Sequence, residues 1–286
     1  MTRFTLLDRT VLITGPARGI GAETARHLAR RGANVALVGL EPERLEALAA
    51  EVGTDRAAWW EADVRDWDAL RAATDGAVER FGGIDVAVAN AGIAPWGTVE
   101  TIDPEQFEAC LEVNLLGVWR TIRTVLPHVR ERQGYLLPIA SLAAALHAPL
   151  ITHYNATKAG VEAFADGLRV ELSGTGTDVG VAYFGFIDTD MVRQVETDPL
   201  AEALRDPGDS AFSRPVPVEG AAAAIVRGIE RRARRVYHPR WILPVLLAPA
   251  PFQRLAELQM RREGISGTVA EINARARQLR VGGRVD

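Results

Sequence analysis

The chain has 286 residues, and its 48% hydrophobic and 24% charged residues are typical of a globular protein with one large α/β domain or two small ones. Its formal net charge of −4 argues against nucleic-acid binding, although the segment from Arg227 onward is basic, with thirteen arginines and five acidic residues. The single cysteine, Cys110, excludes a disulfide framework and a cysteine metal cluster, so no metal site is expected.

Targeting and membrane segments are not expected from the sequence. Residues 1–4 lack the apolar core of a secretory signal, and no apolar run approaches the length of a membrane span. We therefore expect a cytoplasmic protein in which Cys110 is a buried, unreactive thiol.

The N-terminal region contains the parts of a phosphate-binding βα unit. Residues 10–14 form an apolar, β-branched run that predicts a buried strand, and residues 22–31 predict a helix. Between them lies a glycine-rich turn that contains Gly15, Arg18, Gly19, Ile20 and Gly21. Glycines let the backbone approach a pyrophosphate, and a helix N-terminus offers unpaired N–H groups. This context predicts a dinucleotide cofactor.

The end of the second predicted strand, residues 34–38, is where such a fold reads the adenosine ribose. Glu41 follows this strand and would bind ribose hydroxyls and repel the 2′-phosphate of NADP, whereas Arg18 would attract that phosphate. We predict a preference for NAD, with NADP as the alternative. Glu41 could also simply occupy the first turn of the helix that begins at Pro42, where acidic residues are favoured.

Strands and helices alternate along the rest of the chain, which predicts a parallel sheet covered by helices on both faces. In such sheets ligands bind beyond the carboxyl ends of the strands, where Asp63, Asn90 and Ser141 fall. The further strands are expected at 57–62, 85–89, 135–140 and 178–184, and the further helices at 42–51, 66–81, 104–130 and 151–172.

Tyr154 and Lys158 are four residues apart in a predicted helix, so they share one face. A nearby cation favours the phenolate and would lower the pKa of Tyr154, which makes it a candidate acid/base. Lys158 is the only lysine in the chain, and its compact ammonium differs in shape from an arginine fork. Asn114 lies in an apolar helical stretch, where a buried amide needs hydrogen-bond partners. In a purely structural role, backbone groups would supply these partners.

Taken together, these motifs resemble the classical short-chain dehydrogenase/reductase family. The matching residues are Thr14-Gly15-x-x-x-Gly19-Ile20-Gly21, Asp63-Val64, Asn90-Ala91-Gly92, Asn114, Ser141 and Tyr154-x-x-x-Lys158. The resemblance implies a Rossmann-type, doubly wound parallel sheet of seven strands with helices on both faces. It also implies hydride transfer between a nicotinamide cofactor, NAD or NADP, and an alcohol or carbonyl.

The resemblance implies a role for each matching residue. Tyr154 would exchange the proton on the substrate oxygen, and Lys158 would lower the Tyr154 pKa and hold the nicotinamide ribose. Ser141 would bind the substrate oxygen, and Asn114 would hold a water of a proton relay. The remaining cofactor contacts are assigned to Asp63 and Val64 at the adenine, to Asn90, Ala91 and Gly92 along the cofactor, and to Ile187 and Thr189 at the carboxamide and phosphate.

Two departures from the family pattern stand near these motifs. The usual Pro-Gly after the sixth strand is replaced by Phe184-Gly185, which we expect to change the stiffness of the loop more than its contacts. Pro138 lies inside the fifth predicted strand, where proline removes a donor from the ladder.

We divide the chain into residues 1–240, a single Rossmann domain with a substrate lid at 190–217, and a C-terminal extension at 241–286. The extension is basic and broken by prolines, so we expect it to pack on the pocket or on a neighbouring subunit. Contact with a membrane surface is the alternative, which the prolines disfavour because they would break an interfacial helix. The family resemblance implies a homodimer or homotetramer.

The residues expected near the substrate are apolar, which predicts a hydrophobic alcohol or ketone. They are Ile93, Pro95, Trp96, residues 142–146, Met191 and Val192, while His153 is expected in the core or on the surface more than at the substrate. Two rival functions remain. One is a dinucleotide-binding regulator without turnover, and the other is a sugar-nucleotide epimerase or dehydratase that shares the Tyr-x-x-x-Lys pattern.

Overall fold

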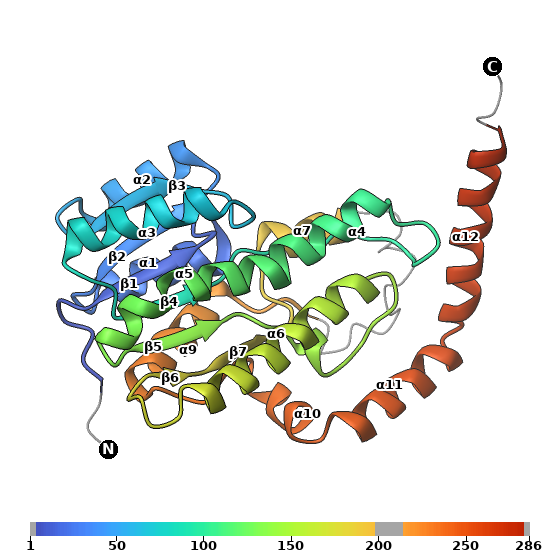
Figure 1. Ribbon diagram of the computed structural model, residues 1–286. Helices are drawn as coiled ribbons and strands as arrows, with labels where there is room; N and C mark the ends of the chain where they lie inside the picture. The colour runs from blue at the N-terminus through green and yellow to red at the C-terminus, as the bar shows by residue number, and fades with distance from the viewer. Residues whose placement is uncertain (1–3, 198–213, 283–286) are drawn as a thin grey trace.

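The computed structural model describes residues 4–197 and 214–282. Over these residues the main sheet has six parallel strands in the order β3-β2-β1-β4-β5-β6, and a smaller sheet pairs β7 with β8 (Figure 1). The strands are β1 (Thr10–Thr14), β2 (Asn34–Gly39), β3 (Ala57–Glu61), β4 (Val86–Ala89), β5 (Tyr135–Pro138), β6 (Asp178–Val179), β7 (Val181–Phe184) and β8 (Arg235–His238). The strand order reverses at β1, and ligands bind at such switch points in open parallel sheets.

Helices cover both faces of the sheet, as the alternation of strands and helices predicts. They are α1 (Gly19–Ala29), α2 (Pro42–Val52), α3 (Trp67–Phe81), α4 (Pro104–Leu111), α5 (Gly117–Glu131), α6 (Thr152–Glu171), α7 (Asp190–Thr197), α9 (Val218–Arg231), α10 (Leu243–Leu247), α11 (Pro249–Arg262) and α12 (Ile265–Gly282). Leu12 and Ala36 pack with α3, α5 and α6, whereas Val11 and Ile13 pack with α1, α2 and α9. Neighbouring residues of one strand therefore fill two cores, which explains the nearly continuous apolar runs.

The predicted single sheet of seven strands is interrupted at its sixth position. Ile139 donates its backbone N–H toward β4, so the N–H groups of the even-numbered residues of β5 point toward β6 and β7. Pro138 has no N–H to donate to the carbonyl of Gly180, the residue between β6 and β7 that the register places opposite Leu137. The ladder resumes where Ala140 donates to β7 (2.8 Å). The missing donor of Pro138 thus explains why six strands plus two replace the predicted seven.

Local capping signals set the ends of several helices. Asp66 caps α3 by accepting from the N–H groups of Asp68 and Ala69, and Gly82 ends it in the left-handed conformation (φ 76°). The long helix expected at 104–130 contains a π-helical turn, Glu112–Leu116, between α4 and α5. Such turns are frequent at functional sites, and this one contains Asn114.

The C-terminal helices differ in how firmly they join the body. Val245 and Leu246 of α10 are buried in the core that also contains α3, α5 and α6. α11 has no buried residue, and α11 and α12 extend away from the body on one side (Figure 1). Gln253 of α11 accepts from the His147 backbone (2.8 Å), and Asn273 of α12 accepts from the Thr98 hydroxyl (2.6 Å). Across the described ranges, no helix has the length and apolar character needed to cross a bilayer.

Candidate active site

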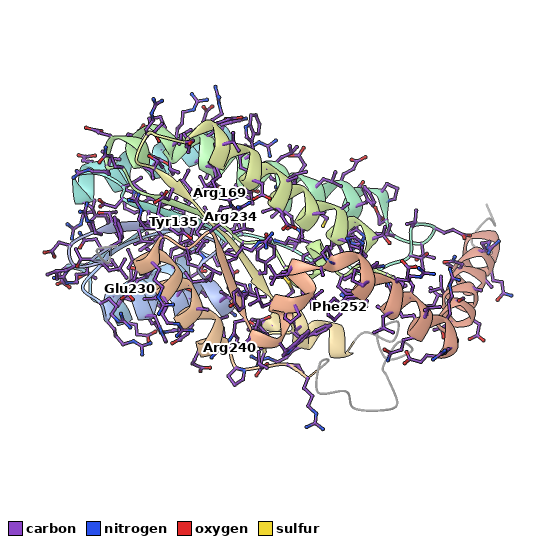
Figure 2. The ribbon with its side chains drawn as sticks, turned by 90° about the horizontal axis from the view of Figure 1, so that it is seen from below. Tyr135, Arg169, Glu230, Arg234, Arg240 and Phe252 are labelled. Carbon is purple, nitrogen blue, oxygen red and sulfur yellow. The ribbon has the colours of Figure 1, made fainter. Side chains whose placement is uncertain are left out.

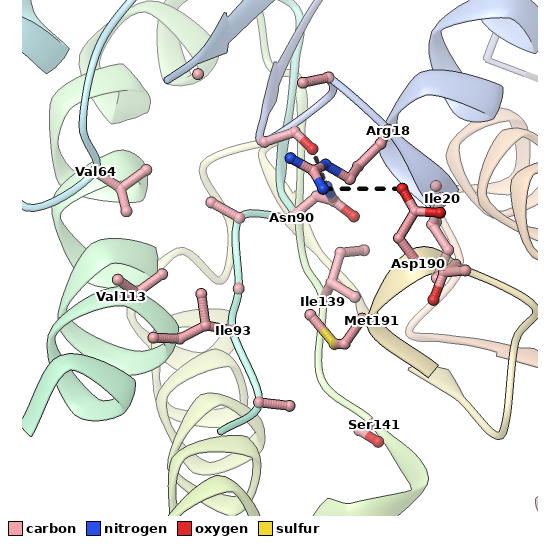
Figure 3. A pocket seen from close by; sticks show the side chains of 18 of the residues that line it. Arg18, Ile20, Val64, Asn90, Ile93, Val113, Ile139, Ser141, Asp190 and Met191 are labelled. Carbon is pink, nitrogen blue, oxygen red and sulfur yellow. Dashed lines mark hydrogen bonds and ion pairs between the residues drawn. The ribbon is translucent and has the colours of Figure 1, made fainter. Parts of the chain in front are cut away.

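A cleft of about 770 Å³ lies at the carboxyl ends of β1, β2, β4 and β5. Figure 3 shows it between the glycine-rich turn, the loop after β4 and the start of α7. All of the residues predicted to bind the cofactor or to act on the substrate line it, except Gly21 and Asn114, which lie directly behind its wall. The lining includes Gly15, Arg18, Gly19, Ile20, Glu41, Asp63, Val64, Asn90, Ala91, Gly92, Ser141, Tyr154, Lys158, Ile187 and Thr189.

The glycine-rich turn is shaped so that only glycine fits at its closest approaches. Gly15 has φ +65°, and a Cβ there would lie 2.8 Å from the Cα of Ala91. A Cβ on Gly21 would lie 2.7 Å from Nδ2 of Asn90. That amide donates to the carbonyls of Thr14 and Gly15 (both 3.0 Å). Asn90 therefore holds the turn in place, and the tight backbone fits the approach of a pyrophosphate.

One end of the cleft, beyond β2, carries a charge pair between two residues that we predicted to contact the cofactor. Arg18 Nε donates to Glu41 Oε1 (3.2 Å), and a second bond joins the same two side chains. Arg18 also lies 3.8 Å from Asp190, the first residue of α7 (Figure 3). Arg44 lies 3.2 Å from Glu41. Glu41 thus neutralises the positive charge of Arg18 at this end of the cleft.

Asp63 and Val64 follow β3 and line the cleft. Asp63 accepts from the Arg65 backbone N–H (2.8 Å) and from the Arg65 guanidinium (2.9 Å). Arg65 holds the pKa of Asp63 below its ordinary value, so this carboxylate is charged at neutral pH. Val64 packs against Gly117, where a Cβ would lie 2.7 Å from the valine Cγ2. The first residues of α5 therefore fix this wall.

Tyr154 and Lys158 lie one turn apart on α6, and both line the cleft. Lys158 Nζ is 5.5 Å from the centre of the Tyr154 ring and donates to the Ile139 carbonyl (2.9 Å). Ser141 follows β5 on the same wall, and its hydroxyl donates to the Phe184 carbonyl (3.4 Å). The phenol, the ammonium and the hydroxyl are therefore brought together as the family resemblance implies.

Burial dominates the electrostatics of this wall. It raises the pKa of Tyr154 to about 12, while interaction with the Ser141 hydroxyl lowers it in part. Burial also lowers the pKa of Lys158 to about 8, so the ammonium is charged at neutral pH. The prediction of a lowered Tyr154 pKa is thus wrong for this arrangement. The loss of hydration, which sequence spacing does not show, is the largest cause of the raised pKa.

Asn114 is fully buried in the π-helical turn and is satisfied by backbone groups. Its Oδ1 accepts from the Ile93 N–H (2.8 Å), and its Nδ2 donates to the Ile93 carbonyl (2.8 Å). This pairing holds the loop after β4 and matches the structural role considered for this residue. A Cβ on Gly92 would lie 3.2 Å from Asn114 Oδ1 and 3.7 Å from Lys158 Nζ. Asn114 therefore lies beside Lys158, and its part in a proton relay stays a prediction.

The segment after β7 closes the cleft beside the glycine-rich turn. A Cβ added at Gly19 would lie 3.2 Å from Cγ2 of Thr189. Ile187 is buried and forms a β-bridge with Val216. Val216 also accepts from Asp188 N–H (2.9 Å). The two ends of the predicted lid at 190–217 therefore meet, and its residues 198–213 lie outside the described ranges.

Part of the cleft is lined by apolar side chains, among them Ile93, Pro95, Met191 and Val192. Trp96 and residues 142–146, which we expected there, are not among the described residues that line it. The sequence interpretation missed Gln106, Ala109 and Val113, which also line the cleft. Their spacing of three and four residues places them on one face of a helix, and this periodicity was the available signal.

His153 and Cys110 are structural, as the sequence favoured. His153 is buried, and its Nε2 forms a hydrogen bond with the Pro95 carbonyl (2.8 Å). Its ring also packs against Phe107, with 5.7 Å between the ring centres. Cys110 is buried, and burial raises the pKa of its thiol, which keeps it protonated.

The fold and this cleft define a nucleotide-binding enzyme, and comparison with known proteins gives its family. The sequence matches the short chain dehydrogenases over residues 9–200. It is 32% identical over 272 residues to 11-beta-hydroxysteroid dehydrogenase 1A of Arabidopsis thaliana. This alignment covers 92% of this chain and 77% of that protein. It is also 33% identical over 205 residues to the 3-oxoacyl-acyl-carrier-protein reductase of Staphylococcus aureus. That alignment covers 70% of this chain and 81% of the reductase.

The structure is similar to an alcohol dehydrogenase from the archaeon Thermococcus sibiricus complexed with 5-hydroxy-NADP. The TM-score is 0.69 with 28% sequence identity, over 80% of this chain and 95% of that chain. The chain belongs to the short-chain dehydrogenase/reductase family. It is an oxidoreductase that acts on CH–OH groups of small molecules with NAD or NADP.

Proposed function

We propose that the protein interconverts an alcohol and a carbonyl on a hydrophobic small molecule, with Tyr154 as the acid/base. The observation that supports this proposal is the meeting of Tyr154, Lys158 and Ser141 on one wall of the cleft, across from the glycine-rich turn. A bound nicotinamide supplies or takes the hydride. The protein's own side chains bind and orient the substrate and the cofactor, and they transfer the proton.

In carbonyl reduction, the Tyr154 hydroxyl gives its proton to the substrate oxygen, and the Ser141 hydroxyl donates a second hydrogen bond to that oxygen. A pKa of about 12 keeps Tyr154 protonated at neutral pH, which suits the donor role. In alcohol oxidation the phenolate is required. Lys158 then stabilises it, because a charged ammonium favours the ionised phenol.

Lys158 and Asn114 would also serve the cofactor and the proton path. Lys158 Nζ keeps two donors besides the one it gives to Ile139, and these suit the hydroxyls of the nicotinamide ribose. Asn114 lies beside Lys158, which supports a relay water held between this helix and the ammonium. The relay would return the Tyr154 proton to solvent after each turnover.

The charge pair at the ribose end favours NAD over NADP. Glu41 would accept from the ribose hydroxyls, and it neutralises Arg18, which would otherwise attract a 2′-phosphate. Asp63 and Val64 would contact the adenine, and Ala91, Gly92 and the segment 187–189 would lie along the rest of the dinucleotide. NADP remains the alternative.

The substrate class follows from the apolar lining of the cleft, which Ile93, Pro95, Met191 and Val192 supply. Two relatives are named for a hydroxysteroid and a 3-oxoacyl substrate, which are carbonyl or alcohol groups on apolar bodies. The lid at 190–217 would close over this side, and the extension at 241–286 would pack beside it. We further propose a cytoplasmic homodimer or homotetramer.

Removal of the Tyr154 hydroxyl tests the proposal. Tyr154→Phe should lower turnover by about 10²- to 10⁴-fold, because it removes the proton donor without changing the wall of the cleft. Binding of NADH, followed by its fluorescence, should change little. The control is Tyr237→Phe, which removes a hydroxyl on β8 outside the cleft and should keep turnover.

The substrate panel should contain apolar alcohols and ketones, and nicotinamide absorbance gives the rate. Near-normal turnover in Tyr154→Phe would contradict the assigned acid/base. Cofactor binding by the wild-type protein without turnover on the whole panel would instead favour the dinucleotide-binding regulator.

A further inference from the structure

A second concave surface, separate from the cofactor cleft, is lined by four arginines. It has a volume of about 450 Å³ and lies where α9 meets β8. Arg227 and Arg231 come from α9, Arg235 from β8, and Arg240 from the turn after β8, which Figure 2 labels at the lower edge of the molecule. None of the described residues that line this surface is acidic. We refer to it as the basic pocket.

The arginines of the basic pocket differ from their neighbours in forming no ion pair with any described residue. Arg232 pairs with Asp178 (2.9 Å), and Arg234 lies 3.7 Å from Asp166. Over residues 4–197 and 214–282, no hydrogen bond or ion pair is found for the four guanidinium groups of the pocket. Arg227 and Arg231 are four residues apart on one helix face, where like charges repel. A ligand of negative charge would remove this repulsion.

The open edge of β8 adds backbone donors to the basic pocket. Within the described strands β8 pairs with β7 alone. The carbonyls of Arg234 and His238 accept hydrogen bonds from β7 and from the residue after it (3.1 and 3.0 Å), so the even-numbered residues of β8 face β7. The N–H groups of Arg235 and Tyr237 therefore point to the open edge, and both residues line the pocket. Arginine forks and backbone N–H groups are the donors that bind phosphate oxygens.

We propose that the basic pocket binds a ligand with clustered phosphate groups. Its volume lies in the range of small-molecule sites, and four guanidinium groups balance more than one phosphate. Two sources share this chemistry, a soluble organic di- or triphosphate and the headgroups of anionic phospholipids. A second copy that docked here by two-fold symmetry would bring arginine against arginine. Charges that only protect an open strand edge would need no concave surface, and they would show no selective binding.

The first test measures a soluble phosphate compound. Inorganic tripolyphosphate is titrated calorimetrically into the full-length protein at fixed ionic strength, with saturating nicotinamide cofactor so that the glycine-rich turn is already occupied. The variant Arg227→Gln/Arg235→Gln is compared with Arg254→Gln/Arg261→Gln, which removes the same charge from exposed positions of α11. The wild-type and the α11 variant should bind, and the pocket variant should bind at least about tenfold more weakly, because it loses two charge-assisted contacts.

The second test distinguishes the lipid source. The same three proteins are sedimented with phosphatidylcholine vesicles that contain or lack phosphatidic acid. Sedimentation that requires phosphatidic acid and is lost in the pocket variant alone would assign the site to lipid headgroups. Tripolyphosphate binding without such sedimentation would assign it to a soluble phosphate compound. The proposal is overturned if neither ligand binds, or if both variants lose binding equally. Unchanged turnover and unfolding midpoints show that the variants are folded.

Discussion

The buried ammonium of Lys158 leads to a prediction that can be followed on one side chain, because it is the only lysine in the chain. Lys158 is 4% exposed, and burial lowers its pKa from 10.5 to about 8. One pKa unit corresponds to about 1.4 kcal/mol. Carrying this charge therefore destabilises the folded state by about 3 kcal/mol at neutral pH, relative to a lysine that keeps its ordinary pKa.

The sign of the pH dependence follows from the two pKa values. Below pH 8 the folded and the unfolded chain both bind the proton, and the full destabilisation is present. Between pH 8 and 10.5 the unfolded chain binds more protons, so the free energy of unfolding rises with pH. Lys158→Met removes this dependence, whatever the packing of the methionine. From pH 7 to 10, the wild-type protein should therefore gain about 2.5 kcal/mol relative to Lys158→Met.

Two measurements check this prediction. Urea unfolding, followed by the fluorescence of the six tryptophans, gives the free energy of unfolding of both proteins at each pH. Lysine labelled with ¹³C at Cε should give one side-chain resonance, and its chemical shift should titrate near pH 8 in the folded protein. Parallel stability profiles for the two proteins, or a titration near 10.5, would show that this ammonium is hydrated and would refute the reasoning.

Two further substitutions test the cofactor side of the cleft. Gly15→Ala should destabilise the protein by about 2–4 kcal/mol and weaken cofactor binding, because it combines a positive φ with a clash against Ala91. The control, Gly82→Ala, also has a positive φ but open space around the new Cβ, so it should destabilise the protein by only about 1–2 kcal/mol. Equal losses of the free energy of unfolding in urea would show that the contact with Ala91 does not matter. Glu41→Gln should release Arg18 and raise the ratio of kcat/KM for NADP to that for NAD by about tenfold or more, since it removes a repulsive charge from the 2′-phosphate. An unchanged ratio in steady-state assays would place the discrimination elsewhere.

Much of the fold and part of the site could be predicted because short-range physics governs them. The apolar strand at 10–14, the glycine-rich turn and the following helix are contiguous, so their order and composition alone indicate a βα unit. The four-residue spacing of Tyr154 and Lys158 places them on one face of any helix, and α6 contains both. Alternation of strands and helices predicts layers for the same reason, because each element shows its own period.

Other features depend on groups that lie far apart in the chain and could not be predicted from it. Asn114 holds the loop after β4 through Ile93, 21 residues away, and Arg18 pairs with Glu41, 23 residues away. Pro138 splits the strand order only because its position in the ladder is the one that would donate to the distant Gly180 carbonyl. The raised pKa of Tyr154 and the lowered pKa of Lys158 arise from burial by several elements at once. Local pattern thus predicts which residues reach the cleft, whereas their pairing and their charge depend on what surrounds them after folding, since desolvation and long-range contacts have no local signal.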